Sequence, residues 1–293
     1  MVKLEHEPVL KREVLTFLGV KKDGLYIDAT VGAGGHSIAI CKEGAKVLGI
    51  DWDKDMLELA RRNVSCPDVF LVHVNFAKIA EVAREHGFLP ADGVLFDLGI
   101  SSLHLQARRG FSFQEDDLLD MRMNPALQAV TARDLINLLR EDQLYELFSR
   151  TTAKNFARSV ASSIVRVRRQ RKIERTSELV DLVNQVATGG MVRRKKIQPA
   201  TTIFLALRMA VNSELENLQQ ALPGAVEVLG KGGRLVIISF HSGEDRIVKN
   251  FLKGEEQGGR LRVLTKKPVT PTQEEVKSNS RSRSAKLRAA EKL

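Results

Sequence analysis

The sequence predicts an α/β protein in which a helical segment interrupts a parallel sheet. Short apolar runs alternate with helical stretches early in the chain, the alternation stops near residue 102, and it resumes near residue 201. Strands separated by helices of this length form right-handed βαβ units and therefore a parallel sheet. A chain of 293 residues has room for two domains at roughly 150 residues each.

Four strands and three helices are expected before residue 102. The strands are runs rich in Val, Ile and Leu, and the helices repeat apolar residues at helical spacing. The expected strands are residues 25–29, 46–50, 69–74 and 93–97, and the expected helices are residues 37–43, 55–63 and 77–86.

The pattern of the interrupting segment, residues 103–200, predicts a loop followed by helices, without strands. Thr131 heads an apolar helical pattern, and residues 153–172 form a long amphipathic helix. Thr176 or Ser177 is the expected N-cap of the next helix, because a hydroxyl there satisfies a backbone N–H that the helix leaves unpaired.

The α/β pattern then returns, so one discontinuous domain, residues 1–102 and 201–293, surrounds the insertion 103–200. Residues 277–293 form a basic C-terminal tail. Its stretch 277–288 is rich in Ser, Arg and Lys, and we expect it to become ordered only on RNA. The later elements are a helix over 201–229, a break at Gly232-Gly233, a buried strand over 234–240, a helix over 246–253 and a last strand over 260–264.

The net charge of +10 is concentrated in three basic segments. Residues 150–175 hold nine Lys or Arg and one acid, residues 193–196 are all basic, and residues 260–293 hold ten bases and three acids. One such run is usually a solvated helix face, but three together favour a nucleic acid, because neutralised phosphates release counterions. The insertion is expected to recognise RNA through Arg166, Arg168, Arg169, Arg193, Arg194, Lys195 and Lys196.

The composition also excludes several classes of protein. No apolar run approaches the roughly 18 residues of a membrane span, and the N-terminus lacks the apolar core of a signal peptide. Cys41 and Cys66 are too few for a disulfide framework and are expected to be buried thiols. No Cys-x-x-Cys or His-Glu-x-x-His pattern predicts a metal site. A cytoplasmic protein is expected.

A glycine-rich turn, Asp28-Ala-Thr-Val-Gly-Ala-Gly-Gly-His, follows the first strand and begins a helix. Such a turn lets the backbone approach a ligand, and the helix N-terminus offers unpaired N–H groups. Asp51 ends the second strand, where a carboxylate can accept both hydroxyls of a ribose. Phe76 and Asp97 follow strands three and four to the same edge, where open α/β sheets bind ligands.

Two ligand classes fit this edge. A dinucleotide needs pyrophosphate at the turn and usually a second nucleotide-binding half. S-adenosylmethionine needs the turn for its amino-acid part, an acid for ribose and a flat apolar contact for adenine. The Asp28 carboxylate before the turn suits an ammonium group and would repel pyrophosphate. The insertion also stands where a second nucleotide half would begin, so S-adenosylmethionine is favoured.

Ten motifs occur in order along the chain: His6-Glu-Pro-Val-Leu, Asp28-Ala-Thr-Val-Gly-Ala-Gly-Gly-His-Ser, Asp97-Leu-Gly-Ile-Ser-Ser, Arg109-Gly-Phe-Ser-Phe, Leu119-Asp-Met-Arg-Met, Phe156-Ala-Arg, Pro199-Ala-Thr, Val211-Asn-Ser-Glu-Leu, Ser239-Phe-His-Ser-Gly-Glu-Asp-Arg and Arg281-Ser-Arg-Ser-Ala-Lys-Leu-Arg-Ala-Ala-Glu. Together they resemble the bacterial 16S ribosomal RNA cytosine-N4 methyltransferases, the RsmH or MraW family. The resemblance implies a class I Rossmann-like methyltransferase sheet and S-adenosylmethionine as cofactor. It also implies a target at N4 of a cytidine in the decoding centre, in the P-site region.

The resemblance assigns cofactor contacts to single residues of this chain. These contacts fall on Gly34, Gly35, His36, Asp51, Phe76 and Asp97, with Gly32 in the same turn and His104 where Gln is usual. Further departures mark a divergent member: Gln198 for His, Thr202 for Arg, Leu205 for Gln, Gly243 for Leu and Ser280 for Pro.

Asp97 and Ser101 are the candidate catalytic residues. The amine at N4 is a poor nucleophile because its lone pair is delocalised into the ring, so the site must accept an N4–H hydrogen bond and align the reacting atoms. Asp97 is the best-placed acceptor, although it equally suits the methionine end of the cofactor. His241 follows a strand and could face the substrate, but a histidine at a strand end is more often a hydrogen-bonded structural residue. Phe111 and Phe113 could stack on a flipped base, but loop aromatics over a sheet are more often core.

Three functions remain open. The favoured one is an enzyme that methylates 16S ribosomal RNA within the small subunit or a late assembly intermediate. An NAD-dependent oxidoreductase would leave the basic patches without a purpose. A non-catalytic RNA-binding or ribosome-assembly protein with a methyltransferase fold would not need the intact cofactor residues. The oligomeric state is unassigned, with a homodimer as one alternative.

Overall fold

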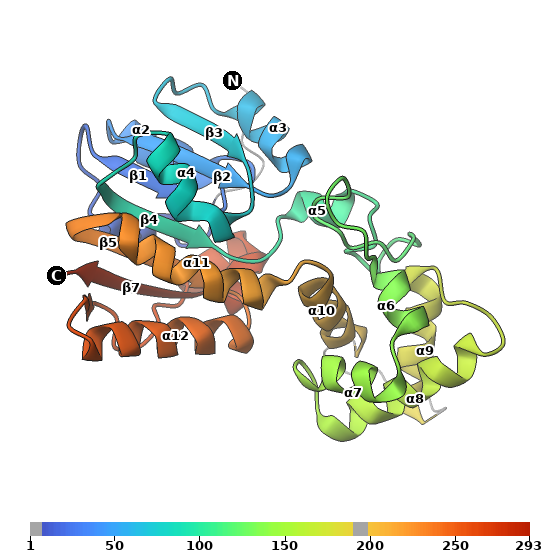
Figure 1. Cartoon of the computed structure of the whole chain (residues 1–293). Helices are drawn as coiled ribbons and strands as arrows, with labels where there is room; N and C mark the ends of the chain where they lie inside the picture. Colours follow the sequence, from blue (N-terminus) through green and yellow to red (C-terminus); the bar gives the residue numbers. More distant parts are fainter. Residues whose placement is uncertain (1–7, 190–198) are drawn as a thin grey trace. The chain divides into compact units, whose positions relative to one another are not determined.

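A computed structural model describes residues 8–189 and 199–293, apart from the side chains of Ser102 and Gln106. The chain divides into two compact units, the first formed by Met1–Gly99 with Leu215–Leu293 and the second by Ile100–Glu214. Figure 1 shows the sheet of the first unit and the helices of the second. The predicted α/β class with a helical insertion is confirmed. No helix in the described ranges has the length and apolar character of a membrane span.

The first unit is built on a seven-stranded sheet with the order β3-β2-β1-β4-β5-β7-β6. Its strands are β1 Leu25–Asp28, β2 Lys46–Asp51, β3 Val69–His73, β4 Ala91–Asp97, β5 Leu229–Ser239, β6 Leu261–Val263 and β7 Lys286–Lys292. The strands β1 to β5 pair in parallel, and β7 runs antiparallel between β5 and β6. The carboxyl ends of β1 to β5 therefore meet at one edge of the sheet.

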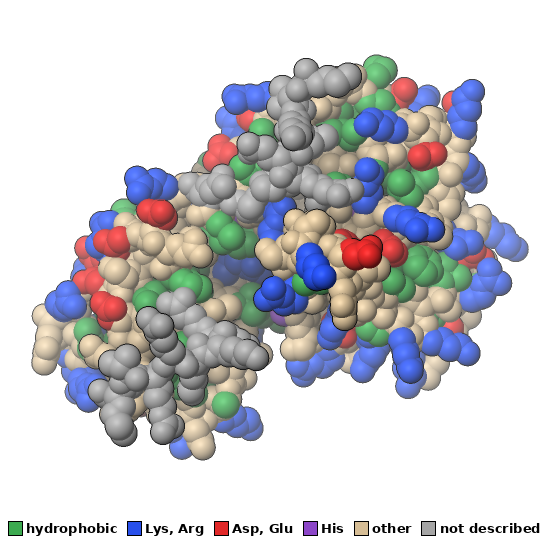
Figure 2. All heavy atoms as spheres, turned by 180° about the vertical axis from the view of Figure 1, so that it is seen from behind, with side chains coloured by type: hydrophobic (Ala, Val, Ile, Leu, Met, Phe, Trp, Pro, Cys, Tyr) green, Lys and Arg blue, Asp and Glu red, His purple; other side chains and the backbone are tan. Residues whose placement is uncertain are grey.

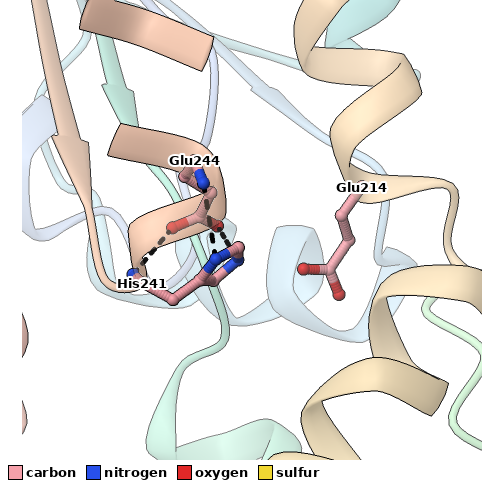
Figure 3. A group of neighbouring side chains, drawn as sticks. All are labelled: Glu214, His241 and Glu244. Carbon is pink, nitrogen blue, oxygen red and sulfur yellow. Dashed lines mark hydrogen bonds and ion pairs between the residues drawn. The ribbon is translucent and has the colours of Figure 1, made fainter. Parts of the chain in front are cut away.

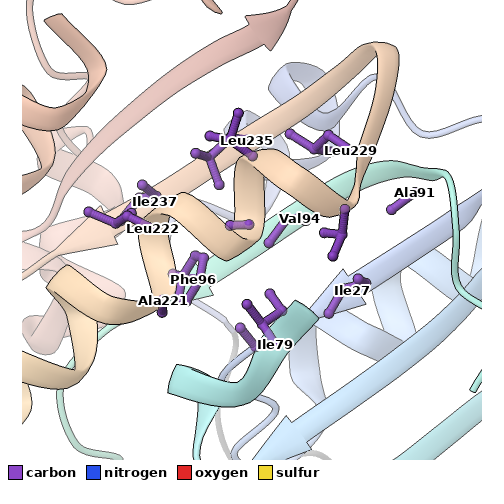
Figure 4. Close-up of a cluster of buried hydrophobic side chains, with 14 of the residues drawn as sticks. Ile27, Ile79, Ala91, Val94, Phe96, Ala221, Leu222, Leu229, Leu235 and Ile237 are labelled. Atoms are coloured by element: carbon purple, nitrogen blue, oxygen red, sulfur yellow. The ribbon is translucent and has the colours of Figure 1, made fainter. Parts of the chain in front are cut away.

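Helices cover both faces of this sheet. They are α1 Lys11–Leu18, α2 Gly35–Lys42, α3 Lys54–Asn63, the 3-10 helix η1 Phe76–Lys78, α4 Ile79–Glu85, α11 Glu214–Val228, α12 Ser242–Gln257, α13 Gln273–Ser278 and the 3-10 helix η2 Ser280–Ser284. Phe96 and Ile237 pack with α4 and α11 on one face (Figure 4), while Leu95 and Val236 pack with α1 and α2 on the other. This alternation follows from the two-residue period of a strand.

The second unit is helical. Its helices are α5 Ser102–Gln106, α6 Ala132–Leu138, α7 Glu141–Ser149, α8 Lys154–Arg168, α9 Thr176–Thr188 and α10 Ala200–Val211. The helices α6 to α10 share one core, which includes Phe148, Ile164 and Leu179. Ile203 and Leu207 of α10 belong to this core, so the unit ends at Glu214 and not at residue 200, the boundary that the sequence suggested.

The basic tail is an ordered part of the sheet, so the expectation that it becomes ordered only on RNA is wrong. β7 pairs with β5 from Arg234↔Glu291 to Ser239↔Lys286. Leu287 and Ala289 are buried, and Arg288 between them is only 7% exposed. Its guanidinium Nε donates to Oδ1 of Asp245 on α12 at 2.6 Å, which neutralises the buried charge.

Several local expectations also need correction. The helix predicted over 201–229 is two helices, separated at Ser213, which has φ 48°. The Gly232-Gly233 break lies inside β5, where the pairing with β4 shifts. α8 ends at Arg168, and the N-cap of α9 is Arg175.

Cys41 and Cys66 are joined by a disulfide, with their Cα atoms 6.6 Å apart, so the prediction of two separate thiols is wrong. Cys41 lies on α2, and Cys66 lies between α3 and β3. The two residues are 25 positions apart, and nothing in their spacing predicts the pairing.

The Asp245–Arg288 pair gives a prediction about stability. Burial by itself would raise the pKa of Asp245, but the hydrogen bonds and charge of Arg288 hold it below its usual value. The stabilisation is therefore present above the unfolded pKa of about 3.9 and is lost as the pH falls through the folded pKa. Arg288→Met should lower the free energy of unfolding at pH 7 by about 3 kcal/mol, and by less in acid.

Urea unfolding at pH 7 and at pH 3 measures both values. The control is Arg262→Met, which removes an arginine from a more exposed pair with Glu291 and should change stability by about 0.5 kcal/mol or less. If both variants lose the same free energy of unfolding at pH 7, the stabilising role assigned to the Asp245–Arg288 pair is contradicted.

Candidate functional site

Asp28 ends β1 and lies buried beneath the glycine-rich turn. It is 1% exposed, its Oδ2 accepts a hydrogen bond from the Ser37 hydroxyl at 2.7 Å, and its Oδ1 accepts one from the Thr30 N–H at 3.3 Å. Burial raises the pKa of Asp28, and the nearby His36 ring and these hydrogen bonds oppose the rise. A cationic ligand group at the turn would favour the ionised carboxylate, whereas an anionic group would disfavour it.

The glycine-rich turn is held against α3. Gly34 has φ 90°, and a Cβ at this position would lie 2.6 Å from Cγ2 of Val64, so the backbone conformation and the contact both require glycine. Asn63 Nδ2 donates to the Ala33 carbonyl at 3.1 Å. α2 begins at Gly35, immediately after the turn, so its first N–H groups lie at the ligand-binding edge of the sheet.

Asp51 is oriented by backbone groups from both sides. Its Oδ2 accepts the Gly32 N–H at 2.8 Å, and its Oδ1 accepts the Asp53 N–H at 2.8 Å. The first contact ties the end of β2 to the glycine-rich turn after β1. A carboxylate has about four acceptor positions, so these two bonds fix its direction and are compatible with further donors from a ligand.

Phe76 follows β3 through a local cap. Asn75 Oδ1 accepts the Ala77 N–H at 2.9 Å and begins η1, which places Phe76 at the strand end. Its ring meets Phe96 edge-on, with centroids 5.7 Å apart and an interplanar angle of 89°. A half-buried aromatic ring beside a polar edge suits a flat, apolar ligand group.

His36 and Asp97 hold buried polar atoms without partners in the described structure. His36 is 5% exposed, and its Nε2 lies 3.6 Å from Oδ2 of Asp97. Neither ring nitrogen of His36 nor Oδ1 of Asp97 has a hydrogen bond among the described residues. Buried polar atoms are almost always hydrogen-bonded in native structures, so these atoms mark a place for a polar ligand.

The structure therefore brings most of the predicted cofactor residues to one edge of the sheet. These are Gly32, Gly34, Gly35, His36, Asp51, Phe76 and Asp97, all in the first unit.

Ser101 and His104 lie in the second unit, where they support each other. Ser101 is the N-cap of α5, and its hydroxyl accepts the Leu103 N–H at 3.2 Å. His104 is 6% exposed, and its Nδ1 accepts the Ser101 N–H at 3.0 Å. This capping box gives both residues a structural role, and their predicted contacts with ligands stay predictions.

His241 caps α12, in keeping with its structural interpretation. Its Nδ1 accepts the Gly243 N–H at 3.2 Å, and its Nε2 lies 3.1 Å from Oε1 of Glu244 (Figure 3). Glu244 is 2% exposed and accepts the Phe240 N–H at 2.8 Å through Oε2. The pair forms a reciprocal cap that fixes the end of β5. A Cβ at Gly243 would lie 3.0 Å from the His241 ring.

Phe111 and Phe113 belong mainly to the core of the second unit. Phe111 is 7% exposed, and the Phe113 ring meets Phe204 edge-on with centroids 5.3 Å apart. Both rings also line a cavity of about 620 Å³. The remaining lining residues are Leu105, Arg108, Ser112, Gln114 and Glu115. The core interpretation therefore accounts for most of their contacts, and base stacking stays a prediction.

The predicted RNA-binding arginines differ in environment. Arg166 and Arg169 are exposed on α8. Arg168 is half-buried, its Nη1 donates to the Ile136 carbonyl at 2.6 Å, and burial lowers its pKa. Arg168 therefore holds the last turn of α6. Arg193, Arg194, Lys195, Lys196 and the departure at Gln198 lie outside the described residues.

The other departures have local structural roles. Thr202 donates from Oγ1 to the Pro199 carbonyl at 3.3 Å, and its own carbonyl accepts the Thr151 hydroxyl at 2.8 Å. Leu205 is half-buried on α10. Ser280 is exposed at the start of η2.

Sequence reasoning missed the residues that shape the loop before α6. Asn212 Nδ2 donates to the Met121 carbonyl at 2.8 Å, and its Oδ1 accepts the Met123 N–H at 2.8 Å. Arg208 donates to Glu214 through Nε at 2.7 Å and Nη2 at 2.8 Å. Asn212 and Glu214 stand in the motif Val211-Asn-Ser-Glu-Leu, which was the only signal available for them, whereas Arg208 lies outside the ten motifs.

Comparison with known proteins assigns the family. The profile of the MraW methylase family matches residues 3–293. The ribosomal RNA small subunit methyltransferase H of Sulfurihydrogenibium sp. is 41% identical over 99% of this chain and 100% of its own length. The protein of that name from Thermomicrobium roseum is 45% identical over 98% of this chain and 94% of its own length.

A solved rRNA methylase from Streptococcus thermophilus aligns with a TM-score of 0.48 and 11% identity, over 100% of this chain and 99% of that chain. The family match and the two relatives cover nearly all of the sequence at well above 30% identity. The chain therefore belongs to the MraW methylase family.

Proposed function

We propose that this chain is an S-adenosylmethionine-dependent enzyme that methylates N4 of a cytidine in the decoding centre, in the P-site region, of 16S ribosomal RNA. The observation that carries the proposal is the set of buried polar atoms of His36 and Asp97, beside the glycine-rich turn, that have no hydrogen-bond partner among the described residues, in a chain of a methylase family. The names of the relatives support the RNA substrate. The target atom and its location come from the sequence resemblance.

The residues at the sheet edge fit S-adenosylmethionine. The turn at Gly34 and Gly35 would hold its amino-acid part, Asp51 its ribose hydroxyls, and Phe76 its adenine. Asp28 is buried directly beneath the turn, where it would favour an ammonium group and oppose pyrophosphate. This charge disfavours the NAD-dependent alternative. When bound, S-adenosylmethionine supplies a methyl group on a positively charged sulfur.

Asp97 is the proposed acceptor for the amine. Its Oδ1, which has no partner among the described residues, would accept a hydrogen bond from N4–H and hold the lone pair of N4 toward the methyl carbon. The N4–C bond forms as the C–S bond breaks, and the N4 proton then passes to the carboxylate. His36 Nε2, 3.6 Å from Oδ2, would keep that carboxylate oriented.

The exposed bases of α8 are the proposed RNA contacts of the insertion. Lys154, Arg158 and Arg166 are exposed on this helix, and Arg169 is exposed at its C-cap. Successive members of this set are about one or two helical turns apart. Phosphate contacts of this kind would position the RNA without reading its sequence. A substrate in the small subunit, or in a late assembly intermediate, would place the protein in the cytoplasm.

Asp97→Asn should lower the rate of methyl transfer far more than the cofactor affinity, because the amide retains an oxygen acceptor but cannot take the proton at neutral pH. We expect the single-turnover rate to fall at least about 100-fold, the lower range for loss of a general base. The measurement uses labelled S-adenosylmethionine and small subunits that lack the native modification, with the product mapped by mass spectrometry. Wild-type transfer to another atom, or none, would refute the proposed function.

Asp51→Ala should weaken cofactor binding, because the ribose hydroxyls lose a charged acceptor. A loss of about 2–3 kcal/mol corresponds to roughly 30–150-fold in Kd. The single tryptophan, Trp52, stands next to Asp51 and allows titration by fluorescence, with calorimetry as a second method. The exposed Asp55, at the start of α3, serves as the control as Asp55→Ala. Equal affinity in the two variants would exclude ribose binding by Asp51.

Arg166→Gln with Arg169→Gln should weaken binding to small subunits without changing cofactor affinity. If each arginine contacts one phosphate, the slope of log K against log salt should fall by about 1.4–1.8 in the double variant. Arg168→Gln is the contrasting variant, since it removes the bond to the Ile136 carbonyl and should lower thermal stability instead. A salt slope that only Arg168→Gln alters would contradict this division of roles.

A further inference from the structure

The 3-10 helix η2 leads into β7 beside the proposed catalytic edge. Lys286, the first residue of β7, pairs with Ser239 at the end of β5, and the neighbouring Ile238 pairs with Asp97 at the end of β4. Adjacent strands lie about 4.8 Å apart, so the start of β7 is about 10 Å across the sheet from the end of β4. The residues of η2, 280–284, immediately precede this point.

Five of the ten basic residues in 260–293 have partners within the fold. Four of them bind carboxylates, and Lys292 donates to backbone carbonyls, among them that of Val226 at 2.8 Å. The four pairs are Arg260 with Glu255, Arg262 with Glu291, and Lys286 and Arg288 with Asp245.

Arg281 and Arg283 differ from these residues. Neither makes an ion pair or a hydrogen bond with another described residue through its side chain. Arg283 is exposed, and Arg281 is half-buried. Among the described residues nothing occupies their guanidinium donors, whose geometry matches that of a phosphate.

The backbone that carries these two arginines is firmly held. Ser282, between them, is 0% exposed, and its hydroxyl donates to the Asn279 carbonyl at 2.8 Å. The Ala285 N–H donates to the Ser282 carbonyl at 2.8 Å, and Ala285 is 1% exposed. Because the segment is already ordered, binding at Arg281 and Arg283 would not require the backbone to become ordered first.

Three of the nearby carboxylates have partners within the fold, whereas Glu274 on α13 is exposed. Asp245 is bound by Arg288 at 2.6 Å, and Glu244 is 2% exposed within the cap of α12. Glu275 on α13 accepts the Leu10 N–H at 2.7 Å. Arg246, in the first turn of α12, is exposed and adds a further positive charge at the same edge. The edge beside η2 therefore keeps a positive potential suited to an anion.

We propose that Arg281 and Arg283 bind backbone phosphates of the RNA next to the target nucleotide. The RNA interface would then include the catalytic unit itself as well as the insertion. A base must leave its stack before its exocyclic amine can react, and phosphate contacts close to the reacting edge would hold the flanking backbone while it does so. This inference rests on the proposed function and adds a contact surface to it.

The test compares Arg281→Gln/Arg283→Gln with a control that removes the same charge from the opposite edge of the sheet. The control is Arg84→Gln/Arg262→Gln. Arg84 lies in the last turn of α4, before β4, and Arg262 is next to the pairing of β6 with the end of β7. Both control arginines are exposed and form surface ion pairs.

Binding to unmodified small subunits is measured across a salt series, together with steady-state methylation and calorimetric affinity for S-adenosylmethionine. In the η2 variant the salt slope should fall by about 1.4, or 0.7 for each phosphate on a single strand. The KM for subunits should rise, while kcat at saturation and cofactor affinity should match the wild type. The control should match the wild type throughout. Arg281→Lys/Arg283→Lys should recover most of the binding, since it keeps the charge.

The outcomes separate two failures. If the wild type binds and methylates subunits and the η2 variant has the same slope and KM, the phosphate contacts are wrong and the proposed function stands. If the wild type neither binds nor methylates subunits, the proposed function is wrong and this inference is wrong with it. A lower cofactor affinity in both η2 variants would also contradict the inference, because it would indicate a structural role.

Discussion

Parallel pairing of the first five strands is the constraint on which the proposed site depends. Asp28 of β1 pairs with Gly49 of β2 and with Leu95 of β4, so three strands end within a few residues of each other. The hydrogen bond from the Gly32 N–H to Asp51 then joins two of these ends directly. Side chains far apart in the sequence thus reach one edge because backbone pairing places them there, and a shift of register in one strand would separate them.

The local part of this arrangement could be predicted from the sequence. β1 to β4 lie within two residues of their expected bounds, since each strand is a short apolar run between turn residues. The gathering of His36, Asp51, Phe76 and Asp97 at one edge follows from the same pattern. β7 could not be predicted, because its few apolar residues alternate with bases whose charge is neutralised only by Asp245, 43 positions away in the sequence. Pairing at that distance leaves no local signal.

The charge of the chain gives a second example of this limit. A count of bases marks the whole stretch 260–293 as one patch, but half of its arginines and lysines bind partners inside the fold. Arg168 likewise holds the end of α6. Only the structure separates the bases that stabilise the fold from Arg166, Arg169, Arg281 and Arg283, which have side chains left for a ligand. Composition therefore indicated the class of partner, a nucleic acid, better than it indicated which basic residues are available to bind it.

The position of the insertion in the chain has one more consequence. The chain leaves the sheet unit after β4 and returns to it before α11, and no strand pair of the sheet includes a residue from between these points. The inserted segment can therefore change in length or sequence during evolution without altering the register of any strand. Selection for a new target could act on one contiguous stretch of the gene, while the candidate cofactor residues of the sheet unit are inherited unchanged.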